Sequence, residues 1–256
     1  MNLLRTLPPI CLGLALTAGI PSTSVAQDAQ KKAATKTALP PATKSATEPA
    51  HRGETGFWAD RHKLFLDRVK PGDAELLFIG DSITQGWEGA GKDVWKRFYG
   101  ERHAVNLGIG GDRTQHVLWR LDHGEIDGIK PKAAVIMIGT NNMSTNSPEE
   151  IAEGVKLIVG RIQKKQPQTK ILLLAIFPRA AKSDDPIRAK VKETNVLLSK
   201  LDDGKTVKFM DIGNNFLEAD GSLAKEIMPD FLHLSPKGYR IWADAIEPTL
   251  WKMLND

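Results

Sequence analysis

Ala133–Ile138 reads AAVIMI and Ile171–Phe177 reads ILLLAIF. Both runs are continuously apolar, whereas a strand with one face in water alternates apolar and polar residues. A continuous run is typical of a strand buried on both faces, as in a parallel sheet covered by helices on each side. Three more apolar runs indicate strands at residues 75–79, 104–107 and 207–210. Because helical patterns separate the runs, the sequence predicts an α/β fold: a three-layer α/β/α sandwich with a central five-stranded, mostly parallel sheet.

The segments between these runs carry helix signals. A helix is expected to begin after Ser147, because a capping serine, a proline and two glutamates follow one another there. Apolar side chains then recur at helical spacing at residues 151, 155, 158 and 162. Further helices are expected over residues 186–201 and 239–254.

The first 26 residues have the composition of a secretory signal peptide. Arg5 provides a basic start, residues 10–20 are largely apolar, and SVA at residues 24–26 is a small-residue cleavage site. We therefore expect export to the periplasm or the cell exterior after cleavage near Ala26. The apolar stretch is shorter than the ~20 residues that span a bilayer, so stable membrane insertion is not expected.

The chain after the predicted cleavage site divides into two parts. Residues 27–50 are rich in Ala, Lys, Thr and Pro and have no apolar periodicity. Such a segment cannot bury enough surface to offset its ordering entropy, so we expect a disordered linker. Residues 51–256 remain for the folded domain.

Charge and cysteine content exclude several classes of function. The formal net charge is +4, and three of these units belong to Arg5 and the linker, which leaves +1 for residues 51–256. A nucleic-acid-binding domain usually carries a concentrated basic face, so no nucleic-acid partner is expected. The only cysteine, Cys11, lies in the signal segment, so the mature protein has no thiol chemistry. The zinc motif HExxH and cysteine ligand sets are also absent, and no metal or organic cofactor is expected.

Polar and glycine-rich segments follow the predicted strands. In an open parallel sheet, ligands bind at the carboxyl ends of the strands. Ser82 follows the first predicted strand within the motif GDS, where its hydroxyl should be exposed. Asp230 and His233, three residues apart near the other end of the chain, could supply an orienting acid and a base. Together these are the components of a serine hydrolase.

Each motif also has a simpler structural explanation. The GDS tripeptide could be a helix-capping turn, and Asp230 and His233 could form a surface ion pair. Two cofactor motifs are incomplete, because Asp93 replaces the Ser or Thr of a phosphate-binding loop and Arg113 replaces the third glycine of a dinucleotide fingerprint. The motif GxSxG is absent, which argues against the α/β-hydrolase family. The joint occurrence of the polar motifs at the strand ends favours a catalytic interpretation.

Four ordered blocks resemble those of the SGNH (GDSL-type) hydrolases. They are GDS at residues 80–82, NLGIGGD at 106–112, GTNN at 139–142 and DFLH at 230–233. The resemblance covers about residues 70–254 and is closest to the catalytic subunits of platelet-activating factor acetylhydrolase type Ib. It implies a flavodoxin-like SGNH hydrolase domain with carboxylic ester hydrolase activity. The export signal departs from those cytosolic enzymes and leaves the phospholipid substrate open.

The resemblance also implies roles for individual residues. Ser82 would be the nucleophile, His233 the general base and Asp230 the acid that orients the imidazole. The oxyanion would be stabilised by the backbone N–H groups of Ser82 and Gly111 and by the side-chain amide of Asn141. No cofactor takes part in this scheme.

Substrate preference is expected from the neighbours of these residues. By resemblance, Ile83, Thr140 and Leu232 would confine the acyl pocket and favour acetyl or another short acyl group. Trp87 is expected either at the rim of this pocket or as a core or surface tryptophan. The alcohol could belong to an O-acetylated polysaccharide, to a phospholipid of the platelet-activating-factor type, or to a substrate of a lysophospholipase or lipase. A catalytically silent glycan-binding module is the non-enzymatic alternative. A homodimer is expected by analogy alone.

Overall fold

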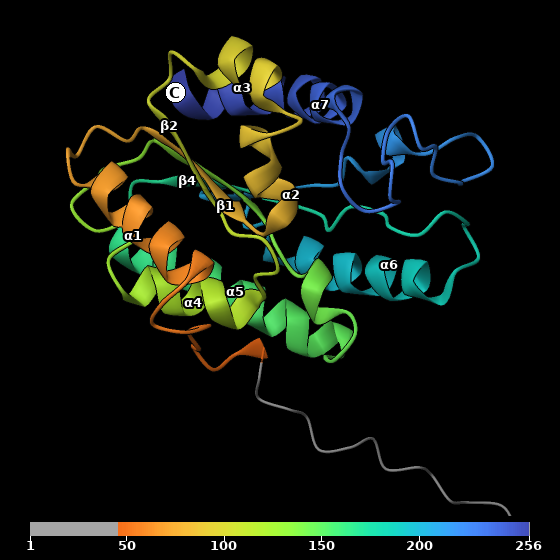
Figure 1. Ribbon diagram of the computed structural model, residues 1–256, viewed down its shortest axis with the longest axis horizontal. Helices are drawn as coiled ribbons and strands as arrows, with labels where there is room; N and C mark the ends of the chain where they lie inside the picture. Colours follow the sequence, from red (N-terminus) through yellow and green to blue (C-terminus); the bar gives the residue numbers. More distant parts are fainter. Residues whose placement is uncertain (1–45, 256) are drawn as a thin grey trace, which may run out of the picture. The chain divides into compact units, whose positions relative to one another are not determined.

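The computed structural model describes residues 46–255 (Figure 1). The predicted signal peptide and residues 27–45 of the predicted linker lie outside these residues. Residues 46–50 were expected to belong to the linker but are part of the folded structure. Ala46 is fully buried, and its carbonyl accepts a hydrogen bond from Thr114 Oγ1 at 2.7 Å.

The centre of the fold is a sheet of five parallel strands in the order β2-β1-β3-β4-β5. The strands are β1 (Leu76–Gly80), β2 (Ala104–Gly108), β3 (Ala133–Met137), β4 (Lys170–Leu174) and β5 (Val207–Met210). This confirms the predicted sheet, which is parallel throughout. The apolar run after Lys170 continues beyond the end of β4 as buried chain, which is why the sequence placed the end of that strand at residue 177.

Helices cover both faces of the sheet (Figure 1). One face carries α1 (Phe57–Val69), α4 (Thr114–Asp122), α5 (Pro148–Lys165) and α6 (Pro186–Leu198). The other carries α2 (Ser82–Gln85), α3 (Lys92–Tyr99) and α7 (Pro236–Asn255). Short 3-10 turns occur at η2 (Gly86–Glu88), η3 (Thr140–Asn142), η4 (Ser199–Leu201) and η5 (Gly213–Phe216).

The caps of the helices explain where they begin. At the start of α5, Ser147 Oγ accepts a hydrogen bond from Glu150 N at 3.2 Å, and Glu150 Oε2 accepts one from Ser147 N at 2.9 Å, which is a capping box. Helix α7 begins three residues before the predicted start at residue 239, because Pro236 fits a first helical turn and Ser235 Oγ accepts from Gly238 N.

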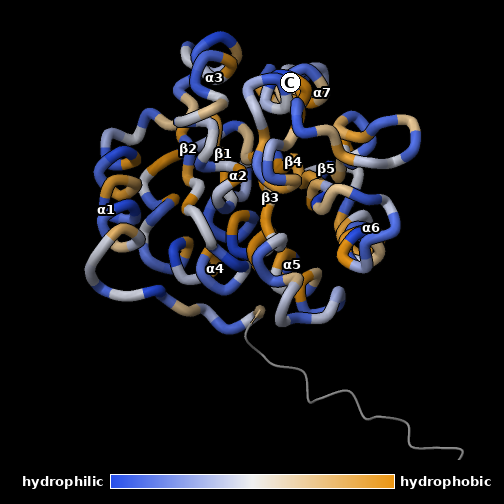
Figure 2. Tube along the Cα trace, turned by 45° about the vertical axis from the view of Figure 1, so that its right-hand side comes forward, coloured by the Kyte–Doolittle hydropathy of each residue, from blue (hydrophilic) through white to orange (hydrophobic). Residues whose placement is uncertain are grey.

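Alternate side chains of the strands enter two separate apolar cores. In β1, Leu77 and Ile79 pack with α1, α4 and α5, whereas Leu76 and Phe78 pack with α3 and α7. Figure 2 shows the apolar colouring concentrated on the strands and on the helix faces that meet them. Each fully buried side chain of this kind contributes roughly 1.5–3 kcal/mol, so packing on both faces holds the sheet rigid beneath its carboxyl edge. Within residues 46–255, no helix combines the length and apolarity required to cross a bilayer.

Candidate active site

Ser82 is the first residue of α2 and lies two residues beyond the end of β1. The turn is tight, since a Cβ on Gly80 would clash with the Thr84 side chain of α2 and with the carbonyl oxygen of Met137 in β3. Asp81 caps the helix, with its Oδ1 accepting a hydrogen bond from Ile83 N at 3.0 Å. The Ser82 side chain is therefore held at the carboxyl edge of the sheet.

His233 reaches Ser82 from the loop before α7. Its Nε2 lies 2.9 Å from Ser82 Oγ, and its Nδ1 lies 2.7 Å from Asp230 Oδ2. The three side chains therefore form one hydrogen-bonded series from carboxylate to imidazole to hydroxyl, across 151 residues of sequence between Ser82 and His233. The simpler explanation for Asp230 and His233, an isolated ion pair on the surface, does not account for the contact of His233 with Ser82.

The Asp230 carboxylate also shapes its own loop. Its Oδ1 accepts hydrogen bonds from Leu232 N at 3.1 Å and from His233 N at 2.7 Å. Phe231 between them has φ 59°, a left-handed conformation that is costly for a residue with a side chain. The hydrogen bonds to Asp230, together with that from Ala180 N to Phe231 O at 2.9 Å, hold the backbone there. One carboxylate thus fixes both the loop and the imidazole.

The ionisation of Asp230 follows from the same contacts. Partial burial acts to raise the pKa of Asp230, but hydrogen bonds from the ring and backbone of His233 outweigh it, and the pKa lies below its usual value. Asp230 is therefore an anion at neutral pH, and it can hold the Nδ1–H tautomer that leaves Nε2 free to accept a proton.

The loop between β2 and α4 lies beside Ser82. Gly110 N donates to Gln85 Oε1 at 2.7 Å, and a Cβ on Gly110 would lie 3.8 Å from the Ser82 Cβ. Gly111 has φ 78°, which favours glycine. Within the described part of the chain, the N–H groups of Ser82 and Gly111 have no hydrogen-bond partner. Both are thus available to an anion.

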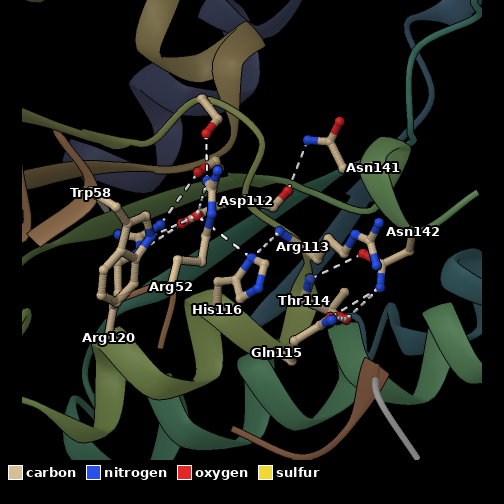
Figure 3. Close-up of polar contacts among 12 residues, drawn as sticks. Arg52, Trp58, Asp112, Arg113, Thr114, Gln115, His116, Arg120, Asn141 and Asn142 are labelled. Atoms are coloured by element: carbon tan, nitrogen blue, oxygen red, sulfur yellow. Dashed lines mark hydrogen bonds and ion pairs between the residues drawn. The ribbon is translucent and has the colours of Figure 1, made fainter. Parts of the chain in front are cut away.

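Asn141 completes this group from the turn after β3. Its Nδ2 donates one hydrogen bond, to the carbonyl oxygen of Asp112 at 2.9 Å, and Figure 3 shows the amide directed toward that carbonyl. An amide nitrogen has two donors, so the second remains for a ligand. The structure brings together all five residues to which the sequence analysis assigned catalytic or oxyanion roles.

Beneath these donors lies a buried polar cluster (Figure 3). The Asp112 carboxylate accepts hydrogen bonds from Trp58 Nε1 at 2.8 Å and from Arg120 Nε at 2.9 Å. Burial raises the pKa of Asp112, while Arg120 and the hydrogen bonds act in the opposite direction. Asn142, also fully buried, bonds through its side chain to Thr114 N at 3.0 Å and so joins the loop after β3 to the start of α4. The sequence showed Asp112 and Asn142 only as members of motifs, because their roles depend on partners distant in the chain.

A second buried carboxyl lies next to the serine. Asp81 is fully buried, and its Oδ2 has no hydrogen-bond partner among residues 46–255. Burial raises the pKa of Asp81 to about 7, with the nearby Asp112 charge adding to the effect.

The residues expected to contact substrate differ in their surroundings. Ile83 and Thr140 are 1% and 2% exposed, and Leu232 is half-buried. Thr140 is held by Arg179 Nη1, which donates to its carbonyl oxygen at 3.1 Å. Trp87 is a core residue, and the expectation that it lines the rim is wrong: its ring is 1% exposed and packs against Tyr239 and Trp242 at centroid distances of 4.6 and 4.9 Å.

No group of three or more His, Cys, Asp or Glu side chains in the described residues is arranged to hold a metal ion. The site can instead transfer a proton from hydroxyl to imidazole beside a set of preorganised N–H donors, which is the requirement of acyl transfer.

Comparison with known proteins gives the same class of chemistry. The model of the GDSL-like lipase/acylhydrolase family matches residues 78–241. Platelet-activating factor acetylhydrolase IB subunit alpha2 from Rattus norvegicus is 38% identical over 200 residues, which cover 78% of this chain and 86% of that protein.

Solved structures agree in fold. A GDSL-like lipase from Bacteroides thetaiotaomicron matches with a TM-score of 0.62 at 16% identity, covering 76% of this chain and 98% of that one. An acetylxylan esterase from Geobacillus stearothermophilus matches with a TM-score of 0.57 at 21% identity, covering 72% and 97%. The sequence matches and the shared fold lead to one conclusion: the chain belongs to the GDSL-like lipase/acylhydrolase family and is a carboxylic ester hydrolase.

Proposed function

We propose that the protein removes short acyl groups, foremost acetyl, from alcohols through a catalytic triad of Ser82, His233 and Asp230. The observation that carries this proposal is the hydrogen-bonded series, with 2.9 Å between hydroxyl and imidazole and 2.7 Å between imidazole and carboxylate. Both distances are within hydrogen-bond range, so His233 Nε2 can accept the Ser82 proton while the Asp230 carboxylate holds the imidazole ring.

The proposed reaction has two halves. Ser82 Oγ attacks the ester carbonyl carbon while His233 Nε2 accepts the hydroxyl proton, and the resulting imidazolium is stabilised by the Asp230 carboxylate. When the tetrahedral intermediate collapses, the carbon–oxygen bond to the alcohol breaks and His233 returns the proton to the leaving alcohol. Water then attacks the acyl-serine with His233 again as base, which releases the carboxylic acid and restores Ser82.

Negative charge develops on the carbonyl oxygen in both halves. We assign its stabilisation to the N–H groups of Ser82 and Gly111 and to the Asn141 amide. These donors are fixed before substrate binds, so little reorganisation is needed at the transition state, and a single donor of this kind is typically worth ~10²–10³ in turnover.

One observation supports a short acyl group: relatives at 38% identity are named acetylhydrolases. For the alcohol, the relatives' name supports a phospholipid of the platelet-activating-factor type, whereas the predicted export supports an O-acetylated polysaccharide.

Covalent labelling tests the triad. A fluorophosphonate probe should form one adduct, on Ser82, in the wild type. Labelling should be lost in Ser82→Ala and greatly slowed in His233→Ala. Ser199→Ala is a matched control, since Ser199 Oγ bonds only to the Val196 carbonyl, and it should label normally. A folded wild-type protein that takes no label would favour the catalytically silent binding module.

A substrate panel tests the acyl and alcohol preferences. Among p-nitrophenyl esters of increasing acyl length, the acetate should be cleaved fastest, with Ser82→Ala as the blank. Acetate release from acetylated xylan is then compared with hydrolysis of an sn-2 acetyl phospholipid. Good cleavage of long-chain esters with negligible deacetylation would refute the short-acyl proposal.

We further propose export with cleavage near Ala26, on the basis of the signal-like composition of residues 1–26. Amino-terminal sequencing of protein recovered outside the cytoplasm should begin at Gln27.

Sedimentation of the same material tests the homodimer, which is expected by analogy alone.

A further inference from the structure

Asp112 connects the proposed oxyanion donors to one another. It directly follows Gly111, and its carbonyl oxygen accepts the hydrogen bond from Asn141 Nδ2 at 2.9 Å. A displacement of Asp112 would therefore move both the Gly111 N–H and the Asn141 amide. The side chains that hold Asp112 in place therefore also fix the position of both donors in the proposed reaction.

Arg52 holds this loop from outside. Its Nη1 donates to the carbonyl oxygen of Gly110 at 2.6 Å and to Asp112 Oδ1 at 3.2 Å. Its guanidinium also lies against Gly111, where an added Cβ would be only 3.1 Å from Nη2. One side chain thus contacts three consecutive residues of the loop, and Figure 3 shows Arg52 next to Asp112.

The same guanidinium balances the charge of the cluster. Asp112, Arg120 and Glu125 have fully buried side chains, and Arg120 pairs with both carboxylates. These three groups together carry one excess negative charge when both acids are ionised. Arg52, whose side chain is 34% exposed, supplies the compensating positive charge. With both acids ionised and Arg52 removed, one carboxylate charge would remain unbalanced beneath the point where the oxyanion develops, which opposes the reaction.

The segment that carries Arg52 is itself anchored to the domain. Ala50 N donates to the carbonyl oxygen of Gln115 at 3.1 Å, and the Ala46 carbonyl accepts from Thr114 Oγ1 at 2.7 Å. Residues 46–52 lie before the stretch 78–241 that matches the family model. Arg52 itself therefore lies outside the four motif blocks, although the residues that it contacts belong to the block at residues 106–112.

We propose that Arg52 is a positioning residue for the oxyanion site: through Gly110 and Asp112 it holds the Gly111 N–H and the Asn141 amide where the ester oxygen becomes charged. This inference rests on the proposed esterase function. It assigns Arg52 an effect on turnover rather than on ground-state binding, because its contacts are with the donors and not with the substrate.

The test compares Arg52→Met and Arg52→Lys with Arg68→Met. Arg68 is a matched control, since its side chain is 38% exposed and pairs with one carboxylate, Asp73, at 2.7 Å. For p-nitrophenyl acetate, Arg52→Met should lower kcat by roughly 10- to 100-fold, less than the complete loss of a donor, with KM within about twofold of wild type. Arg52→Lys should recover part of kcat, because it keeps the charge but not the forked geometry. Arg68→Met should match the wild type.

Hydrogen–deuterium exchange gives a readout that does not need activity. The peptide covering residues 107–113 should exchange faster in Arg52→Met than in the wild type and Arg68→Met, with the rest of the sheet unchanged. Unchanged exchange and unchanged kcat in both Arg52 variants would overturn the inference. A wild-type protein that hydrolyses no ester would refute the proposed function, while the exchange experiment would still decide whether Arg52 positions the loop.

Discussion

Neighbouring residues in the turn after β3 have opposite tasks. Asn141 is partly exposed and uses one amide donor to hold its orientation, which leaves the other for the proposed oxyanion. Asn142 is fully buried and spends its side chain on Thr114, Gln115 and Asn146. The two side chains are identical and adjacent in sequence, but their contacts differ. Asn141 is therefore suited to binding the proposed oxyanion, whereas Asn142 holds the loop after β3 to the start of α4.

Substitution of each asparagine should separate these tasks. Asn141→Ala should lower kcat by ~10²–10³ and should cost less stability than Asn142→Ala, because the Asn141 side chain is partly exposed and makes a single, part-buried hydrogen bond. Asn142→Ala should instead lower the free energy of unfolding by about 1–3 kcal/mol, because it leaves the buried Thr114 N–H without a partner. Ester kinetics and urea unfolding measure both effects. A kcat for Asn141→Ala within threefold of wild type would remove Asn141 from the oxyanion site.

At the scale of the element, α5 supports the site through one close contact. A Cβ on Gly154 would lie 2.5 Å from the Ala46 carbonyl oxygen and 2.8 Å from Thr114 Oγ1. The absence of a side chain there lets the Ala46 carbonyl and the Thr114 side chain approach the α5 backbone closely. One turn and a half further along, Gly160 is exposed and a Cβ would meet nothing within 4 Å.

The two glycines of α5 predict opposite changes in stability. Gly160→Ala should raise the free energy of unfolding by about 0.5–1 kcal/mol, since alanine loses less backbone entropy in a helix. Gly154→Ala should lower it, because the backbone carbonyl of Ala46 must move. It should also lower kcat by displacing the segment that carries Arg52. Urea unfolding and ester kinetics on both variants test this, and an equal gain in stability from both would contradict the contact.

At the scale of the whole folded domain, buried ionisable groups make stability depend on pH. His62 lies between Trp58 and Trp119, with ring centroids at 6.0 and 5.2 Å, and its Nδ1 has no partner in the described residues. Burial, with the Arg120 charge as a second cause, lowers the pKa of His62 to about 4. The unfolded chain protonates His62 near pH 6.5, whereas the folded state keeps it neutral down to about pH 4. The free energy of unfolding therefore falls as the pH is lowered from about 6.5 to about 4.

Replacement of His62 should weaken this acid sensitivity. His62→Phe keeps a ring between the two tryptophans but cannot take up a proton. The loss of unfolding free energy between pH 7.5 and pH 5 should therefore be smaller in the variant than in the wild type by about 1–2 kcal/mol. Because Asp81 and Glu125, whose pKa values burial raises to about 7, act in the opposite direction, the difference between the two proteins is the informative quantity. Equal pH dependence in both proteins would show that His62 is not the cause.

Local pattern determined the layers of this protein. The continuous apolar runs at residues 133–138 and 171–177 required burial on both faces, and burial on both faces requires helices on each side of a parallel sheet. The motifs after the strands, and the pair Asp230 and His233, likewise indicated the side chains that we propose to react, because several such polar motifs occur together at the predicted strand ends. The ends of strands and helices were predicted less accurately: the strand expected to end at residue 177 ends at Leu174, because the chain beyond it stays buried after the strand has ended.

Tertiary structure alone decided which side chains support the site. Neither the contact of Arg52 with Gly110 and Asp112 nor the burial of Trp87 has a signature in sequence, because each depends on which segment happens to pass a given point in space. The periodicity of apolar residues indicates only whether a side chain is buried. Which residues it contacts is decided when segments distant in the chain pack together. Arg52, for example, is separated from Gly110 by 58 residues and from Asp112 by 60 residues of sequence.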